Sequence, residues 1–243
     1  MYDRLRRTRR LKRRTRPRLG RTLVLPSEFP EVAGYPAFQE LLARRVDMQV
    51  NDVRALLRLP IPAAEFRDSE GRPLAGLDAG CNLLATTAIF NLVAGASVCF
   101  FEASPRSISD RRDRGRRFKE VLERFFPWAG EPASAAEGAR MLYDLARNPL
   151  AHSLGLEPAS EEERDEPDLD IAINKWALRP EQIALLEDSP RRPPWTYGVL
   201  TVNAVTGQRL SISVPALYWG FHRMLHALFA DADQVRRANE LAS

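Results

Sequence analysis

The stretch GCNLLATTAIFNLVAGASVCFF, from Gly80 to Phe101, is a run of 22 residues without a charged side chain. A run of this length is long enough to cross a bilayer as a helix. Five uncharged polar side chains interrupt it: Asn82, Thr86, Thr87, Asn91 and Ser97. Its hydropathy is modest, and the chain has no second run of this kind. We therefore predict a buried core helix over residues 78–103, with a membrane anchor as the alternative.

The same run contains both cysteines of the chain, Cys81 and Cys99. On one helix they would lie ~27 Å apart, which is too far for a disulfide. They indicate small buried apolar groups in a reducing compartment, and we expect a cytoplasmic protein. No secretory signal is expected, because the basic N-terminus leads to Pro26 without an apolar core.

Around this run, apolar residues recur every three or four positions in segments that predict further helices. These helices are expected at residues 36–58, 109–126, from 134 towards 147, 180–187 and 215–237. Ser134 and Glu137 have the spacing of a capping box. Alternating or β-branched segments at 171–178, 197–205 and 208–214 predict three short strands, with Thr206-Gly207 as a hairpin turn. The predicted fold class is α+β, mainly α, with a small antiparallel β-sheet and a C-terminal helix.

Charge and proline content divide the chain into segments. Residues 1–21 hold 11 of the 36 Lys and Arg residues but one of the 32 Asp and Glu residues, so the rest of the chain is net acidic. Residues 1–22 are therefore expected to be a basic disordered tail, which is either a solvated tail, an RNA- or DNA-binding arm, or the product of a misassigned start codon. The segments that follow are an N-terminal helix and Pro-rich linker (23–77), a helical core (78–156), an acidic loop (157–170) and a sheet with a C-terminal helix packed on the core (171–243).

The hexapeptide Arg147-Asn148-Pro149-Leu150-Ala151-His152 carries the clearest chemical signal. Proline is favoured at the first position of a helix, and the residue before it is pushed into an extended conformation. Asn148 can therefore cap a helix that begins at Pro149. This arrangement would gather the Arg147 guanidinium, the Asn148 amide, a helix N-terminus and the His152 imidazole in one place.

These groups suit phosphate chemistry that includes a proton transfer. RNA cleavage needs a base for the ribose 2′-OH, a role that His152 can fill, and it needs stabilisation of the phosphorane charge, a role for Arg147. No metal and no cofactor is expected, because the sequence holds no paired carboxylates or zinc-spaced ligands. The structural alternative is that Arg147 pairs with Asp144 and that His152 caps a helix or packs in a dimer seam.

The hexapeptide and its flanks resemble the HEPN superfamily. Its signature is an arginine, a following polar residue and a histidine after four to six residues, and the match here extends over residues 78–156 with FKEVLERFFP and LYDLARNPLAH. The resemblance implies an α-helical bundle, a homodimer with the motif at the two-fold seam, and metal-independent endoribonuclease activity. It assigns Arg147 and His152 as catalytic and Asn148 as the supporting polar residue.

The resemblance also implies partners: RNA as substrate, and an antitoxin in a toxin–antitoxin or anti-phage defence setting, with no membrane. Some members of the superfamily act as RNA- or protein-binding modules without cutting, so a non-catalytic dimeric binding module is the alternative function. The sheet and the helix at 36–58 lie outside the minimal fold of the superfamily.

Other groups in the sequence are candidate binding residues. The start of the predicted helix at 109–126 carries four arginines that form either a solvated face or a weak nucleic-acid surface: Arg111, Arg112, Arg116 and Arg117.

His222 and His226 have the spacing for one metal, but they lack the glutamate of a zinc motif, and His222 lies on an apolar stripe. We predict a core or interface histidine there, with its hydrogen bonds satisfied. Trp176 and Trp195 are expected to pack the sheet on the helices, with base stacking as a second choice.

Overall fold

The computed structural model describes residue 32 and residues 34–42, 46–59, 81–100, 111–147, 170–174, 177–202 and 209–242. The described helices are α2 (Pro36–Leu41), α3 (Asp47–Arg58), α4 (Asn82–Phe100), α6 (Arg111–Phe125), α7 (Ala135–Met141), the π-helix η4 (Leu142–Arg147), α9 (Pro180–Asp188), the 3₁₀ turn η6 (Pro194–Thr196), α10 (Val214–Phe229) and α11 (Ala232–Ala242). The described strands are β1 (Asp170–Asn174), β2 (Leu200–Val202) and β3 (Arg209–Ser213). The fold is mainly helical with one small sheet, as expected.

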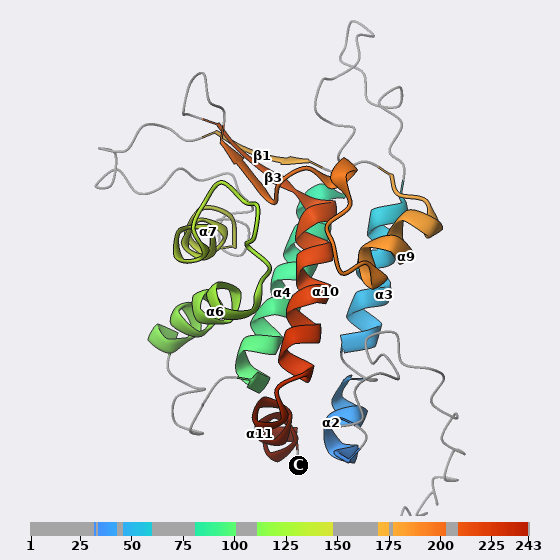
Figure 1. The fold of residues 1–243 in the computed structure, drawn as a ribbon, viewed down its shortest axis with the longest axis vertical. Coiled ribbons are helices and arrows are strands. Elements are labelled where there is room, and N and C mark those ends of the chain that lie inside the picture. The colour runs from blue at the N-terminus through green and yellow to red at the C-terminus, as the bar shows by residue number, and fades with distance from the viewer. Residues whose placement is uncertain are drawn as a thin grey trace, which may run out of the picture.

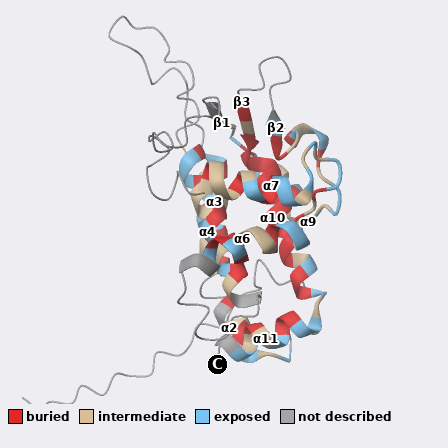
Figure 2. Ribbon diagram, turned by 90° about the vertical axis from the view of Figure 1, so that its left-hand side faces the viewer, coloured by how far each residue is buried: buried red, intermediate tan, exposed pale blue. Residues whose placement is uncertain are grey.

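Helices α4 and α10 form the centre of the molecule (Figure 1). Of the 16 residues of α10, 13 are buried, and Figure 2 shows burial along its whole length. Ile89 and Val93 of α4 are fully buried in the same core. The uncharged run is therefore a core helix over residues 82–100. Within the described residues, no helix combines the length and apolar character needed to cross a membrane.

The remaining helices surround this pair (Figure 1). Helices α6 and α7 lie on one side, and α3 and α9 lie on the other. At the end away from the sheet, α2 and α11 pack together, and Phe38 meets Phe229 edge to face with ring centroids 6.0 Å apart. The C-terminal third of the chain thus supplies the central helix of the core.

The sheet has the strand order β1-β3-β2. Strands β2 and β3 are antiparallel, with Leu200 opposite Ile212, as the hairpin signal predicts. Strand β1, which we expected to be antiparallel as well, runs parallel to β3, with Ile171 opposite Leu210. The hairpin signal concerned only β2 and β3. A long connection through α9, η6 and β2 separates β1 from β3, and such a crossover allows parallel pairing.

One expected helix is divided in the structure, and another is described in two parts. The helix predicted at 36–58 is described as α2 and α3, with residues 43–45 outside the described part of the chain. The helix predicted at 215–237 ends at Phe229, and α11 begins at Ala232. The carboxylate of Asp231 accepts hydrogen bonds of 3.1 Å from the backbone N–H groups of Asp233 and Gln234. This local cap competes with continuation of α10.

The cap expected at Ser134 is confirmed. Its hydroxyl oxygen accepts a hydrogen bond of 3.3 Å from the backbone N–H of Glu137 and begins α7 at Ala135. A second serine, Ser213, begins α10 in the same way, with its hydroxyl accepting from Ala216 N–H at 3.3 Å. The Ser213 hydroxyl also donates to the Thr196 carbonyl at 2.6 Å, which ties η6 to the start of α10.

The packing of α10 generates a stability prediction at Gly220. A Cβ added at this position would lie 2.0 Å from Cζ of Phe126, whose ring is buried against Trp128 at a centroid distance of 4.8 Å. Gly220→Ala is therefore expected to lower the free energy of unfolding by about 1–3 kcal/mol, measured by chemical denaturation.

Gly95 of α4 provides the matched control, because a Cβ there would meet nothing within 4 Å. Gly95→Ala is expected to raise the free energy of unfolding by about 0.5–1 kcal/mol through helix propensity alone. Equal effects of the two substitutions would contradict the close approach of Phe126 to α10.

Candidate functional site

Arg147 is the one residue of the expected catalytic set that the structure describes. It is the last residue of η4, which continues directly from α7. Asn148 and His152 lie outside the described residues. Short π-helical segments are uncommon and are frequently found at functional sites. The end of η4 is therefore a candidate site.

Helix η4 presents two different faces. Leu142 and Ala146 are buried in the core, whereas Tyr143, Asp144 and Arg147 are half-buried. Contacts between η4 and α6 place the half-buried face beside α6. The π-helix thus holds Arg147 at the boundary between the core and the solvent.

Aromatic rings connect this boundary to the centre of the core. Phe90 of α4 meets Phe118 of α6 edge to face at a centroid distance of 6.0 Å. Phe118 in turn meets Tyr143 at 5.3 Å with the ring planes tilted by 52°. Tyr143 is therefore the outermost ring of a three-ring stack that is anchored on α4.

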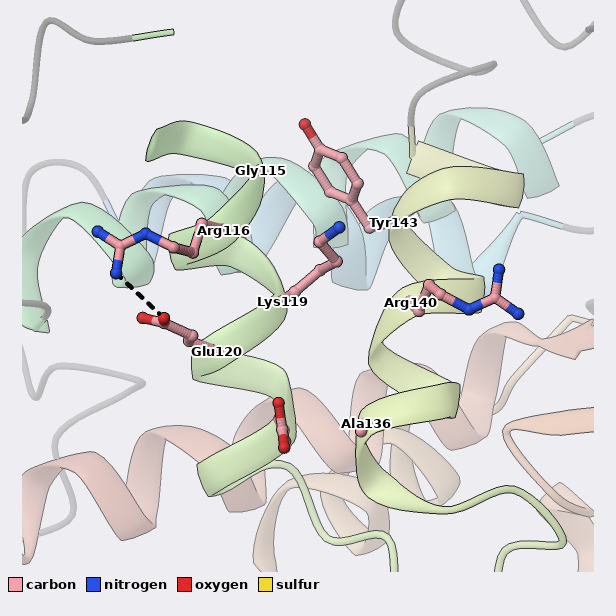
Figure 3. Close-up of a pocket in the computed structure, with 8 residues that line it drawn as sticks. Gly115, Arg116, Lys119, Glu120, Ala136, Arg140 and Tyr143 are labelled. Carbon is pink, nitrogen blue, oxygen red and sulfur yellow. Dashed lines mark hydrogen bonds and ion pairs between the residues drawn. The ribbon is translucent and has the colours of Figure 1, made fainter. Parts of the chain in front are cut away.

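Two cations lie on the ring of Tyr143. The Arg147 guanidinium carbon lies 5.5 Å from the ring centroid, and the Lys119 Nζ lies 5.3 Å from it. Both distances are within the range of cation–π attraction. Lys119 Nζ also lies 3.9 Å from a carboxylate oxygen of Asp144. Figure 3 shows Lys119 and Tyr143 projecting towards each other from α6 and η4.

Lys119 and Tyr143 line an open groove of about 610 Å³ between α6 and the α7–η4 helix. Its lining residues are Gly115, Arg116, Lys119, Glu120, Glu123, Ala136, Arg140 and Tyr143. Arg116 pairs with Glu120 at 3.2 Å, and Arg140 makes no ion pair with a described residue (Figure 3). The groove therefore contains both signs of charge, with an aromatic ring and a lysine at its centre.

The four arginines expected on α6 do not lie on one surface. Arg111 and Arg112 belong to the first turn of α6, and their side chains lie outside the described part. Arg116 is exposed and lines the groove. Arg117 is 2% exposed and buried, so it is not part of an exposed nucleic-acid surface. Its place four residues before Val121, on the apolar stripe of the helix, was the signal for its burial.

A second polar cluster lies between α3, α9 and α10, and sequence reasoning missed it. The carboxylate of Glu187 accepts hydrogen bonds from Nε and Nη2 of Arg54 and, at 2.6 Å, from the Tyr218 hydroxyl. The backbone carbonyl of Glu187 accepts from Arg223. Burial, followed by the negative charge and hydrogen bond of Glu187, raises the pKa of Tyr218 well above its ordinary value. The cluster ties three helices together through one carboxylate.

His222 lies next to this cluster and is buried in the core, as expected, but its Nε2 has no hydrogen-bond partner among the described residues, so it is not the satisfied histidine we predicted. It is 3% exposed, and its ring packs on Tyr218 and Phe221 at centroid distances of 4.7 and 5.6 Å. Burial, with the positive charges of Arg223, Arg54 and His226, lowers the pKa of His222 to about 3. The imidazole is therefore neutral at physiological pH.

Of the two tryptophans expected to pack the sheet on the helices, the structure describes one. Trp195 packs partly buried against the core, whereas Trp176 lies outside the described residues. Among the described residues, no group of three or more His, Cys, Asp or Glu side chains could hold a metal ion.

His222 generates a prediction about pH and stability. Because the pKa falls from 6.5 to about 3 on folding, the unfolded chain takes up this proton first as the pH drops. The contribution of His222 to stability is complete above pH 6.5 and is lost as the pH falls towards 3. In this window the free energy of unfolding is expected to fall by up to about 1.4 kcal/mol per pH unit.

His222→Phe is expected to remove the His222 contribution to the slope of the free energy of unfolding against pH between pH 6.5 and 3. The slope is measured by denaturant unfolding at a series of pH values. His226→Gln, on the same helix but only partly buried, serves as the control and is expected to keep the slope. A slope that is equally steep in His222→Phe would show that other groups cause it.

Comparisons with protein-family models, with curated proteins and with solved structures found no match to this chain.

Proposed function

We propose that this chain is a metal-independent endoribonuclease of HEPN type, in which Arg147 stabilises the charge that develops on the scissile phosphate. The observation that carries the proposal is the position of Arg147. It ends a π-helix and lies over the ring of Tyr143, which lines an open groove. A guanidinium is suited to this role because it can donate two parallel hydrogen bonds to phosphate oxygens.

The proposed reaction needs only groups of the protein and the RNA. The ribose 2′-oxygen attacks the phosphorus after its proton passes to a base, and the 5′-oxygen leaves after it receives a proton. His152 would carry the proton, Arg147 would stabilise the phosphorane, and Asn148 would hold the backbone between them. The products are a 2′,3′-cyclic phosphate end and a 5′-hydroxyl end.

The wider setting of the proposal follows from the resemblance to HEPN proteins. Two chains would form a homodimer with their motifs at the two-fold seam. The basic tail at residues 1–22 would add RNA affinity that does not depend on sequence. A cytoplasmic toxin–antitoxin or defence system, with an antitoxin as the partner protein, is the setting that this reaction would serve.

The test is cleavage of a labelled structured RNA in EDTA by the purified chain. Wild type is expected to cut and to leave 2′,3′-cyclic phosphate ends. Arg147→Ala and His152→Ala are each expected to lower kcat by about 10²–10³-fold. Arg114→Ala removes an exposed arginine of α6 that has no partner among the described residues, and it is expected to keep the wild-type kcat.

Each variant must first be shown to have the circular dichroism spectrum and oligomeric state of the wild type. Cleavage that requires Mg²⁺, or that survives in Arg147→Ala, contradicts the proposal. If pure wild type binds RNA without cutting it, and loses this binding when residues 1–22 are removed, the non-catalytic binding module is the better description.

A further inference from the structure

Tyr143 is held more firmly than an exposed tyrosine would be. One side of its ring packs on Phe118, which is fully buried in the core. Its hydroxyl end lies against α6 at Gly115, where an added Cβ would be 2.7 Å from the hydroxyl oxygen and 2.8 Å from Cζ. The ring therefore occupies space that only a glycine leaves open, and its orientation is set from two directions.

This fixed ring restricts the guanidinium of Arg147. A free arginine side chain samples many rotamers, and it loses this conformational entropy when it binds a substrate. A guanidinium in cation–π contact with a ring that is itself held in place has fewer accessible rotamers, so less entropy is lost when it meets a phosphate. The cation–π contact of 5.5 Å thus connects the position of Arg147 to the core through Tyr143 and Phe118.

Lys119 lies on the same ring, and its position matters for the charge balance. Two cations next to one ring repel each other. Asp144, whose carboxylate lies 3.9 Å from the Lys119 amine, reduces this repulsion. Because Asp144 offsets the charge of Lys119, Arg147 can stay in contact with the Tyr143 ring while Lys119 lines the groove.

We propose that Tyr143 is a positioning residue that holds the Arg147 guanidinium for phosphate stabilisation. This role rests on the proposed ribonuclease function, although the contact between the two side chains does not. Tyr143 acts through Arg147, so its aromatic ring is required and its hydroxyl is not.

The first experiment compares single-turnover cleavage and KM among Tyr143 variants. Tyr143→Phe keeps the ring and is expected to cut at the wild-type rate. Tyr143→Leu removes the ring and is expected to lower kcat about 10- to 100-fold with KM little changed. Tyr35→Leu, a part-buried tyrosine that packs on the core from the start of α2, is the matched control and is expected to keep the wild-type kcat.

A second variant covers the case in which Tyr143→Leu does not fold. Gly115→Ala removes none of the side chains of the site, but its added Cβ pushes the Tyr143 ring away from α6. It is expected to lower kcat in the same direction as Tyr143→Leu. Gly95→Ala, in open space on α4, is its control and is expected to leave kcat unchanged.

The second experiment needs no RNA. The Nε–Hε signal of Arg147, assigned by its disappearance in Arg147→Lys, is expected to show a ring-current shift in wild type and Tyr143→Phe. The shift is expected to vanish in Tyr143→Leu and to change in Gly115→Ala. A wild-type signal without a ring-current shift overturns the proposal, and so does an unchanged kcat in a folded Tyr143→Leu variant.

The two experiments separate the two proposals. If wild type does not cut RNA, the ribonuclease function fails, and the NMR signal still decides whether Tyr143 holds Arg147. If wild type cuts and Arg147 is required, but Tyr143→Leu is as active as wild type, the ribonuclease function stands and the positioning role fails.

Discussion

The burial of α10 on all sides is the constraint on which the rest of the structure depends. Its sequence is apolar around most of its circumference, and a helix of this kind must be covered on every face. Helix α4 covers one face, α6 another, and α9 a third, while β3 leads directly into its first turn. Gly220 allows the Phe126 ring to approach the backbone of α10, because this ring occupies the space that a side chain would fill.

Several polar side chains in the described core have a defined partner, whereas Thr86 Oγ1 and His222 Nε2 accept or donate no hydrogen bond there. Glu187 accepts from Arg54 and Tyr218, and the Trp219 indole donates to the Ser189 carbonyl at 2.9 Å. Glu131 is buried between Arg192 and the Val199 N–H and joins the loop before α7 to β2. His222 remains neutral because burial and its cationic neighbours disfavour its proton. These contacts attach the outer helices and the sheet to the core in a defined register.

The candidate site lies where this core reaches the surface. The stack of Phe90, Phe118 and Tyr143 runs from α4 to η4, so the groove beside α6 rests on rings that are buried in the core. An arginine on a loop alone would be poorly ordered. An arginine on a ring of this stack takes its position from the rigid core, which is the property that a phosphate-stabilising group needs.

The sequence by itself determined the helical class, the central uncharged helix, the Ser134 cap, the β2–β3 hairpin and the burial of His222, because each depends on local pattern or on composition. It also singled out Arg147 as a candidate site residue, which lies at the end of η4. The tertiary structure alone decided the parallel pairing of β1, the burial of Arg117, the Glu187 cluster and the place of Tyr143 between Gly115 and Arg147. These features depend on which residues distant in sequence meet, and hydrophobic periodicity shows which face of a helix is buried but not what lies against it.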